Sequence, residues 1–389
     1  MINVTSKELC CGCEACIQKC PKQCISKKVD NEGYFYPSVD KDICIDCNLC
    51  VRVCPILNDY EIRKPQFVYA AKNKDEEIRR NSSSGGLFFE IAKNVIQQNG
   101  VVFGAKFDQN WNVVHDYTEN VKGLYEFQGS KYVQSNINGA YRKVETFLKA
   151  NRLVLFSGTP CQISALLHFL RKEYQNLLTL DVVCHGVPSN KVWKKFLEEE
   201  LGDNINKINS ISFRNKDDGW LKFKMKIIFK KNISSCISAY GEIQEYSKYH
   251  RQTSFFKGFL TQYFLRPSCY NCKFRSGKSG SDITLADFWG FEEFSNEWND
   301  DKGVSLVLVN TSKGKYMLEA CNVDLLASSY ENAIKGNKSI IKDPNLPLGR
   351  EKVYNRLNKG ICISDALRFG RIEFFVIKVV HKLKEILCV

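Results

Sequence analysis

The chain has 389 residues, of which 44% are hydrophobic and 12% aromatic. This size and composition exclude a chain too polar to fold and indicate about two or three domains. Its 56 Lys and Arg against 43 Asp and Glu give a formal net charge of +13. The basic residues are dispersed and form no block of the kind that binds nucleic acid, so no nucleic-acid partner is expected.

The N-terminal segment has no apolar run that would act as a signal peptide, and no stretch of about 18 apolar residues occurs further along. We therefore expect a cytoplasmic protein. Eighteen cysteines are present, ten of them between Cys10 and Cys54. Because the cytosol keeps thiols reduced, this enrichment argues against disulfides and for metal binding.

One cysteine pattern occurs twice in residues 1–60. Cys-x2-Cys-x2-Cys-x3-Cys-Pro starts at Cys10 and again at Cys44. In bacterial ferredoxins this pattern holds two 4Fe-4S clusters, with the fourth cysteine of each run binding the other cluster. The sequence therefore predicts a dicluster ferredoxin domain over residues 1–60. Its expected ligand sets are Cys10, Cys13, Cys16 and Cys54 for the first cluster, and Cys44, Cys47, Cys50 and Cys20 for the second.

Zinc is the alternative for these cysteines, because Cys-x2-Cys is also a zinc-binding spacing. Two complete runs, each closed by proline, are more specific for iron–sulfur clusters. Cys11 and Cys24 fall outside the pattern, and we interpret both as small buried residues. Two clusters in one small domain transfer single electrons and do not form an active site. The rest of the chain therefore has to supply the electron donor or acceptor.

After a linker around Pro65, apolar runs with strand length alternate with helical periodicity. Ser189 is the expected N-cap of the last helix in this series. The alternation predicts a mixed α/β domain over residues 65–340. The expected strands are 67–71, 101–107, 153–156 and 178–183, and the expected helices are 86–98, 138–149, 162–172 and 190–201.

Three loops of this domain carry unusual chemistry. The first is Ser82-Ser83-Ser84-Gly85-Gly86, which precedes an apolar helix and could bring backbone N–H groups to a phosphate. An ordinary serine-rich N-cap is the alternative. The second, Ser157-Gly158-Thr159-Pro160-Cys161-Gln162, follows a buried strand, where α/β sheets bind ligands. The third contains Cys269-x2-Cys272.

A further cysteine, Cys184, ends the next apolar strand after Cys161, so these two residues could meet in space. Together with Cys269 and Cys272 they would provide four ligands, and we predict a third 4Fe-4S cluster held by this set. Zinc is again the alternative. Each cluster with its thiolates carries about −2, so three clusters would lower the formal charge to about +7.

These motifs, in this order, resemble the coenzyme F420 hydrogenase/dehydrogenase beta-subunit family over roughly residues 5 to 320. Those that carry the resemblance are the dicluster domain, the SSSGG loop, Gly129–Gln134, the GTPCQ loop, Cys184-His185-Gly186, Phe213-Arg214 with Trp220, and the Cys-x2-Cys and DFWG runs. The resemblance implies a FAD-binding α/β domain that exchanges hydride with a soluble carrier or substrate, and electrons with iron–sulfur clusters. Relatives of this kind include deazaflavin-oxidising subunits and proteins encoded with polysaccharide biosynthesis enzymes.

With FAD implied, the SSSGG loop becomes the candidate site for its pyrophosphate. Lys131 and Tyr132 are candidates for the flavin or substrate edge; a solvated surface lysine is the alternative for Lys131. His185 is a candidate proton donor, and the alternative is a histidine that only hydrogen-bonds a cluster sulfur. Phe288 and Trp289 are expected near the third cluster or the flavin, and plain core packing is the preferred reading of Phe288.

The remaining residues, 341–389, form the expected C-terminal tail. Residues 364–387 alternate apolar and basic side chains with helical spacing, which predicts a basic amphipathic helix. Such a helix either docks on the protein or lies on an anionic membrane surface. The expected fold class is therefore α+β, with a bacterial-ferredoxin-like domain, a mixed α/β flavin-binding domain and a helical tail.

The expected function is an iron–sulfur flavoprotein oxidoreductase that works with a redox partner protein or a soluble hydride carrier. The alternatives are an electron-transfer subunit without its own substrate and a non-catalytic factor of polysaccharide assembly.

Overall fold

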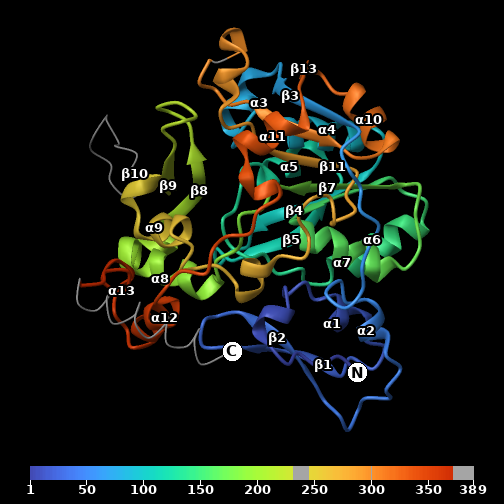
Figure 1. Cartoon of the computed structure of the whole chain (residues 1–389), viewed down its shortest axis with the longest axis vertical. Coiled ribbons are helices and arrows are strands. Elements are labelled where there is room, and N and C mark those ends of the chain that lie inside the picture. The colour runs from blue at the N-terminus through green and yellow to red at the C-terminus, as the bar shows by residue number, and fades with distance from the viewer. Residues whose placement is uncertain (231–244, 299, 371–389) are drawn as a thin grey trace, which may run out of the picture.

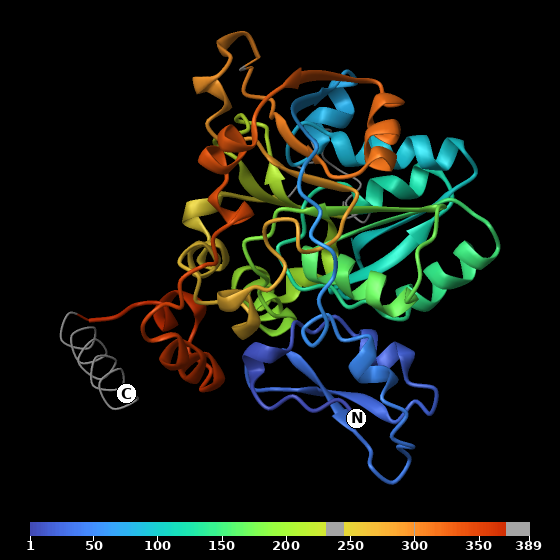
Figure 2. The same ribbon diagram turned by 45° about the vertical axis from the view of Figure 1, so that its right-hand side comes forward.

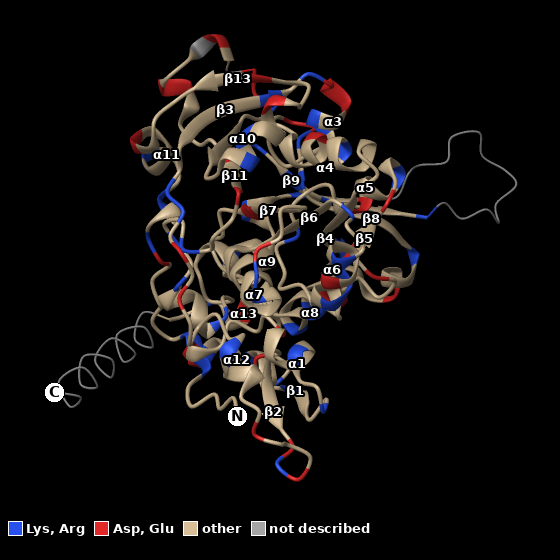
Figure 3. Ribbon diagram, turned by 90° about the vertical axis from the view of Figure 1, so that its right-hand side faces the viewer, with Lys and Arg blue, Asp and Glu red and all other residues tan. Residues whose placement is uncertain are grey.

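A computed structural model of the chain describes residues 1–230, 245–298 and 300–370 (Figure 1). The cysteine-rich N-terminal domain lies at one end of the molecule, below a central α/β domain. A smaller region built around a three-stranded sheet packs beside the central domain. Lys and Arg residues are interspersed with Asp and Glu residues along the ribbon (Figure 3), as their dispersal along the sequence predicted.

The N-terminal domain has two short helices and one β-hairpin. Strands β1 and β2 pair antiparallel, and the helices lie next to the two cysteine runs. Buried cysteines make up much of its small apolar core, together with Ile2 and Ile25. Its elements are η1 (Lys7–Leu9), α1 (Ala15–Lys19), β1 (Ile25–Val29), β2 (Phe35–Val39) and α2 (Leu49–Arg52).

The central domain contains an eight-stranded mixed sheet in the order β13-β3-β12-β11-β7-β6-β4-β5. Strands β4, β6, β7 and β11 are parallel, and β5 and β12 pair antiparallel with their neighbours. The parallel strands are short apolar runs buried on both faces, as such sheets require. The strands are β3 (Phe67–Asn73), β4 (Val101–Phe107), β5 (Val113–Thr118), β6 (Val154–Gly158), β7 (Leu177–Val182), β11 (Ile283–Asp287), β12 (Ser305–Val309) and β13 (Val323–Ala327).

Helices cover both faces of this sheet (Figure 2). One face packs on α4, α5 and α10 through a core that includes Phe89 and Leu180. The opposite face packs on α6 and α7 around Phe156, and further along on α11. The helices are α3 (Glu76–Asn81), α4 (Leu87–Gln97), α5 (Val121–Phe127), α6 (Ala140–Lys149), α7 (Pro160–Leu170), α10 (Ser312–Glu319) and α11 (Tyr330–Gly336).

The smaller region has a core rich in aromatic residues that includes Trp193, which is fully buried. Its three strands pair antiparallel in the order β10-β9-β8. Its elements are α8 (Asn190–Leu201), β8 (Ile208–Asn215), β9 (Lys224–Phe229), β10 (Glu245–Tyr249), α9 (Ser254–Leu260), α12 (Arg350–Asn358) and α13 (Ile363–Ala366). The remaining 3-10 turns are η2 (Gly202–Lys207), η3 (His250–Gln252), η4 (Pro267–Asn271), η5 (Phe291–Glu293), η6 (Asn296–Trp298) and η7 (Lys338–Ile340).

Buried polar contacts fix the N-terminal domain to the rest of the chain. The Arg266 guanidinium, which is fully buried, donates from Nε to the Cys10 carbonyl at 2.7 Å and from Nη2 to the Phe35 carbonyl at 2.9 Å. Arg350 of α12 forms a bidentate pair with Glu32, at 2.8 and 2.6 Å. Helix α12 is thus tied to the N-terminal domain, and the loop that begins at Cys10 faces the central domain.

The expected strands and helices of residues 67–201 are present with small shifts of their ends, and Ser189 caps α8 through a hydrogen bond from the Val192 amide. The predicted long tail helix does not run continuously from Ser364, because α13 ends at Ala366 and residues 368–370 are not helical. The rest of that prediction, residues 371–387, lies outside the described residues. No helix within residues 1–230, 245–298 and 300–370 is long and apolar enough to cross a membrane.

Candidate functional site

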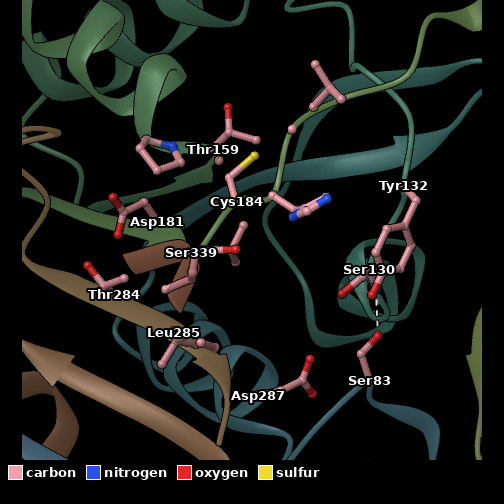
Figure 4. Close-up of a pocket in the computed structure, with 18 of the residues that line it drawn as sticks. Ser83, Ser130, Tyr132, Thr159, Asp181, Cys184, Thr284, Leu285, Asp287 and Ser339 are labelled. Carbon is pink, nitrogen blue, oxygen red and sulfur yellow. Dashed lines mark hydrogen bonds between the residues drawn. The ribbon is translucent and has the colours of Figure 1, made fainter. Parts of the chain in front are cut away.

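A cavity of about 1020 Å³ lies at the carboxyl ends of β6, β7 and β11 (Figure 4). Residues from the SSSGG loop, the GTPCQ loop, the segment after β7 and the Cys-x2-Cys loop all line it. Parallel strands direct their carboxyl ends to the same edge of a sheet, which is where ligands bind in α/β folds. The three loops singled out in the sequence therefore meet at one cavity.

Cys161, Cys184, Cys269 and Cys272 all lie in the wall of this cavity. Burial raises the pKa of the Cys184 thiol well above its usual value, and the nearby Cys269, Cys161 and Cys272 raise it further. Burial likewise raises the pKa of Cys269 to about 12 and that of Cys272 to about 11. Four partly buried thiols this close together become thiolates only if a metal compensates their charge. The donor set fits a metal cluster.

The cysteines of the N-terminal domain form two groups. Cys10, Cys13, Cys16 and Cys54 are electrostatic neighbours, and burial followed by the nearby Cys10 and Cys54 raises the pKa of Cys16. A second, smaller cavity is lined by Cys20, Cys44, Cys47 and Cys50. These are the two crossed sets expected from the ferredoxin spacing. Cys47 is the only exposed member among these eight residues, so the second group lies nearest the surface.

The two additional cysteines of this domain are not remote from the groups. Cys24 Sγ lies 3.4 Å from Cys20 Sγ. Cys11 is buried and lines the cavity, as Cys161 does. Within the described residues, no three His, Cys, Asp or Glu side chains lie close enough together to hold a single metal ion.

The SSSGG loop lines the cavity at every position except Gly85, and two of its serines also support the fold. The Ser82 hydroxyl donates to the Ile78 carbonyl, and the Ser84 hydroxyl donates to the Val304 carbonyl. Gly85 does not line the cavity; a Cβ there would lie 2.3 Å from the Ala71 carbonyl oxygen, so glycine permits close contact with the sheet. Ser83 faces the cavity and accepts a hydrogen bond of 2.8 Å from the Ser130 amide (Figure 4).

The helix that follows this loop, α4, also opens on the cavity. Its N-cap residue, Gly86, has a left-handed backbone conformation with φ of 85°, and no side chain caps the helix. Gly86, Leu87 and Phe88 line the cavity. The first backbone N–H groups of an eleven-residue helix are therefore directed toward this space, which suits an anionic group.

Lys131 and Tyr132 line the same cavity. The Lys131 ammonium donates to the carbonyls of Glu126 and Gln128 at 2.9 and 3.0 Å, at the end of α5. Burial lowers its pKa to about 7. The Tyr132 ring packs edge-on against Phe213, Phe256 and Phe259. Thr159, from the GTPCQ loop, places its hydroxyl 3.2 Å from Cys161 Sγ.

Arg214 and Asp287 form an ion pair that the sequence reasoning did not assign to the site. Arg214 donates to Asp287 at 2.8 and 3.2 Å and to the Tyr132 hydroxyl at 3.2 Å. Trp220 donates to the same carboxylate and stacks on Trp289, with ring centroids 4.6 Å apart. The signal was present in the sequence, because all of these residues except Tyr132 belong to the Phe-Arg…Trp and DFWG motifs.

Two buried nitrogen atoms in the cavity wall have no hydrogen-bond partner among the described residues. They are His185 Nε2 and Arg214 Nε. Unpaired buried donors are rare in proteins because they cost free energy, and they indicate a missing partner such as a ligand. Burial, followed by the nearby Arg275, lowers the pKa of His185, so the imidazole is neutral. Phe288 is fully buried in the apolar core, in agreement with the core-packing role expected for it.

A second polar set reaches the cavity from β5 and β7. His115, which is buried, contacts the Ser157 carbonyl through Nε2 at 3.0 Å and the Ser135 hydroxyl through Nδ1 at 2.9 Å. Burial lowers the pKa of His115 to about 4. Asp181 accepts a hydrogen bond from Ser281, and burial raises its pKa. Sequence reasoning missed both, because a single His or Asp within an apolar strand carries no spacing signal.

These features define a class: a mixed α/β protein in which a four-cysteine group and the N-terminus of a helix share one cavity. Residues 151–330 match the family described as the C-terminal part of the beta subunit of coenzyme F420 hydrogenase/dehydrogenase. Over this segment the match agrees with the resemblance seen in the sequence motifs. The family is one of oxidoreductase subunits, as its description states.

Two other comparisons complete the description. No curated protein matches the chain. One chain in a xenon-derivatized structure of the F420-reducing NiFe hydrogenase complex from Methanosarcina barkeri is 14% identical, with a TM-score of 0.45. The alignment covers 77% of this chain and 91% of that one.

Proposed function

We propose that the chain is an iron–sulfur flavoprotein oxidoreductase that passes electrons between 4Fe-4S clusters, FAD and a soluble two-electron carrier or substrate. The observation that carries the proposal is the shared cavity, where Cys161, Cys184, Cys269 and Cys272 lie in the same wall as the SSSGG loop and the N-terminus of α4. A flavin is the group that joins one-electron carriers to two-electron chemistry.

The three cysteine groups would hold the clusters in series. The exposed Cys47 belongs to the outermost group, and Cys50 of that group is an electrostatic neighbour of Cys16 in the next. Cys11, which follows Cys10 of the first group, lines the cavity together with Cys161 of the third. This order supports a path from the surface of the N-terminal domain to the cavity.

The cavity suits FAD in size and in chemistry. Its volume of about 1020 Å³ lies at the upper end of the range for ligand sites. Ser83 and the amides at the start of α4 would bind the pyrophosphate, whose charge the helix dipole favours. Arg214 Nε and His185 Nε2, which lack partners among the described residues, would hydrogen-bond the bound cofactor or substrate. Lys131, held at the cavity wall, would add positive charge near the flavin edge when protonated.

FAD would supply the exchange of hydride with the substrate, and the chain's residues would position it and move protons. Trp289 and Tyr132 offer aromatic surfaces in the cavity wall, which exclude water from the reacting edge. A neutral His185 retains one nitrogen that accepts a proton and one that donates it, which suits an acid–base role. The carrier could be a deazaflavin, given the family's description, or a precursor in polysaccharide biosynthesis.

A second candidate is an electron-transfer subunit that carries electrons to or from a partner enzyme and has no substrate of its own. The exposure of Cys47 favours it, because a cluster at the surface can exchange electrons with another protein. Co-purification of a stable partner enzyme, together with the absence of turnover by the isolated chain, would support this second candidate.

The test is to purify the protein anaerobically, reconstitute it with iron, sulfide and FAD, and count iron and flavin per chain. About twelve irons and one flavin are expected. About eight irons without flavin would contradict the proposal and leave only a ferredoxin domain fused to a domain of different chemistry.

A further inference from the structure

The Arg266 side chain is a fully buried cation at the junction of the N-terminal and central domains. Its guanidinium donates to the carbonyls of Cys10 and Phe35 at 2.7 and 2.9 Å, and to the side-chain oxygen of Gln134 at 3.0 Å. A Cβ on Gly12 would lie 2.6 Å from its Nη1 atom, so the guanidinium packs directly on the backbone of the loop that begins at Cys10. All three hydrogen-bond acceptors are neutral oxygen atoms.

Arg266 has no carboxylate partner within residues 1–230, 245–298 and 300–370, although it is the least exposed of the four buried arginines there. The other three each form an ion pair with a carboxylate: Arg79 with Asp300, Arg214 with Asp287 and Arg350 with Glu32. Lys216 is also buried and bonds only carbonyls in this part of the chain, but burial lowers its pKa to about 7, so it can lose its charge. A guanidinium keeps its proton, and a buried charge without a counter-charge is strongly destabilising. The counter-charge of Arg266 therefore has to come from another kind of group.

The first cysteine group offers such a counter-charge. Cys10, whose carbonyl accepts from Arg266, is a proposed ligand of the first cluster. A 4Fe-4S cluster with its four thiolates carries about −2 when oxidised and about −3 after it takes up one electron. A cluster in this loop would lie beside the buried guanidinium and compensate its charge.

We propose that Arg266 is the counter-ion of the first cluster and raises its reduction potential. The inference rests on the proposed function, since it requires a cluster at this site. A fixed positive charge stabilises the more negative, reduced form of the cluster more than the oxidised form. The hydrogen bonds of Arg266 reach Cys10 of the first group and no cysteine of the second group. Arg266 would therefore favour movement of an electron from the second cluster to the first, toward the cavity.

The experiment compares Arg266→Gln and Arg266→Lys in the full-length reconstituted protein. Glutamine removes the charge and keeps hydrogen-bond donors, whereas lysine keeps the charge. The readouts are iron per chain and the reduction potentials of the first and second clusters, from dithionite titrations followed by electron paramagnetic resonance. The signal of the first cluster is the one that disappears in Cys13→Ala.

The matched control is the double variant Glu32→Gln with Arg350→Gln. These two side chains form a buried ion pair between the N-terminal domain and α12, and the double change leaves the net charge unaltered. A shift caused by loosening of the contacts around the N-terminal domain would appear in this control. A shift caused by the charge of Arg266 would not.

We expect Arg266→Gln to keep the full iron content and to lower the potential of the first cluster. The expected size is about a tenfold change in the oxidised-to-reduced ratio at fixed potential, or ~59 mV for one electron. The second cluster should shift less, and Arg266→Lys should keep most of the original potential. The double control should leave both potentials unchanged.

A second variant tests the same charge with Arg266 in place, in case Arg266→Gln does not assemble. Gln134 Oε1 accepts from Arg266 Nη1, so Gln134→Glu would put a carboxylate against the guanidinium and cancel its charge. We expect this variant also to lower the potential of the first cluster. An unchanged potential in Gln134→Glu would contradict the inference.

The remaining outcomes separate this inference from the proposed function. An unchanged potential of the first cluster in Arg266→Gln would refute the inference and leave the proposed function intact. Equal shifts in the glutamine and lysine variants, or a shift of the same size in the double control, would show that the charge is not the cause. Absence of the first cluster from the unmodified protein would refute the proposed function, and this inference with it.

Discussion

Cys269 and Cys272 show how the proposed third ligand set depends on individual residues. They lie on and directly after the 3-10 turn Pro267–Asn271, and the fully buried Arg266 anchors the start of that turn. Cys161 begins α7 and Cys184 follows β7, so regular structure positions the other two. Each of the four thiols therefore has a fixed place, and the loss of one cannot be compensated by a neighbour in the same loop.

For the first prediction, Cys269→Ala should lose about four of twelve irons while the N-terminal clusters remain. Iron and sulfide analysis, with the visible absorption of the clusters, measures the loss. Cys321→Ala is the control, since Cys321 is a partly buried cysteine next to α10 that packs on the other face of the sheet. Full iron content in Cys269→Ala would rule this residue out as a ligand.

His115 provides a second prediction, on pH dependence. Burial lowers its pKa in the folded state to about 4, against about 6.5 in an unfolded chain. The unfolded state therefore binds a proton that the folded state does not, and stability contributed above pH 6.5 is lost as the pH falls toward 4. The shift corresponds to about 3 kcal/mol in the free energy of unfolding.

The measurement is the melting temperature at pH 7 and pH 5, for the unmodified protein and for His115→Gln. We expect the unmodified protein to lose more thermal stability than the variant between these two values. Equal losses would show that His115 does not titrate in this range.

At the scale of single elements, α4 links the sheet to the proposed cofactor site. Its apolar face packs on β3, β4 and β6, and its first turn meets the cavity. A phosphate at this end would be stabilised by the helix dipole. A fixed negative charge at the same place would repel it.

The third prediction follows: Ser83→Asp should weaken FAD binding at least about tenfold without lowering the melting temperature, because an acidic residue near a helix N-terminus favours the helix. Fluorescence titration of the apoprotein with FAD measures the affinity. Ser83→Asn keeps the size without the charge and serves as the control. Equal affinity in the aspartate variant and the control would place the pyrophosphate elsewhere.

The central elements were predictable because their patterns are local. Apolar runs of strand length gave β3, β4, β6 and β7, and the helices between them have clear caps, as Ser189 has for α8. The antiparallel additions β12 and β13 were not expected. Their pairing with β3 joins residues more than two hundred positions apart, and no local pattern encodes such a pairing.

The residues of the candidate site likewise fall into those that local spacing predicts and those that depend on contacts between distant parts of the sequence. Cysteine spacing predicted which residues group together in the N-terminal domain, because the ligands of each run are neighbours in sequence. The place of Cys11 could not be predicted, since it lines the cavity together with Cys161, which is 150 positions away in the sequence. Arg214 and Asp287 could not be paired for the same reason, since they lie 73 positions apart, on β8 and β11 of two different sheets.

At the scale of the whole molecule, the N-terminal domain contacts a helix near the C-terminal end of the described chain. Glu32 in the N-terminal domain pairs with Arg350 in α12, and both side chains are nearly buried, at 12% and 10% exposure. The Tyr34 hydroxyl, in the same segment, donates to the carbonyls of Val187 and Phe264. The N-terminal domain is thereby held by segments from the middle and the end of the sequence.

As the fourth prediction, Glu32→Ala should destabilise the protein by about 3 kcal/mol, because it leaves the Arg350 charge buried without its partner. Thermal unfolding, with hydrogen exchange in residues 1–60, measures the effect. Glu293→Ala is the control, since it breaks an ion pair with Lys335 in which both side chains are more than half exposed; its cost should be below about 1 kcal/mol. Similar losses in the free energy of unfolding for the two changes would show that the interdomain ion pair stabilises the protein no more than an exposed pair does.

The spread of the proposed ligands along the chain also orders the maturation of the protein. The first two sets lie within residues 10–54, so a ribosome would expose them early, and cluster-assembly proteins could load them on a nascent chain. The third set spans positions 161–272 and is complete only after most of the chain has been synthesised and folded. In a cell short of iron, molecules would therefore accumulate in which the two proposed N-terminal cluster sites are filled and the proposed third site is empty. Such molecules would be unable to deliver electrons to the cavity.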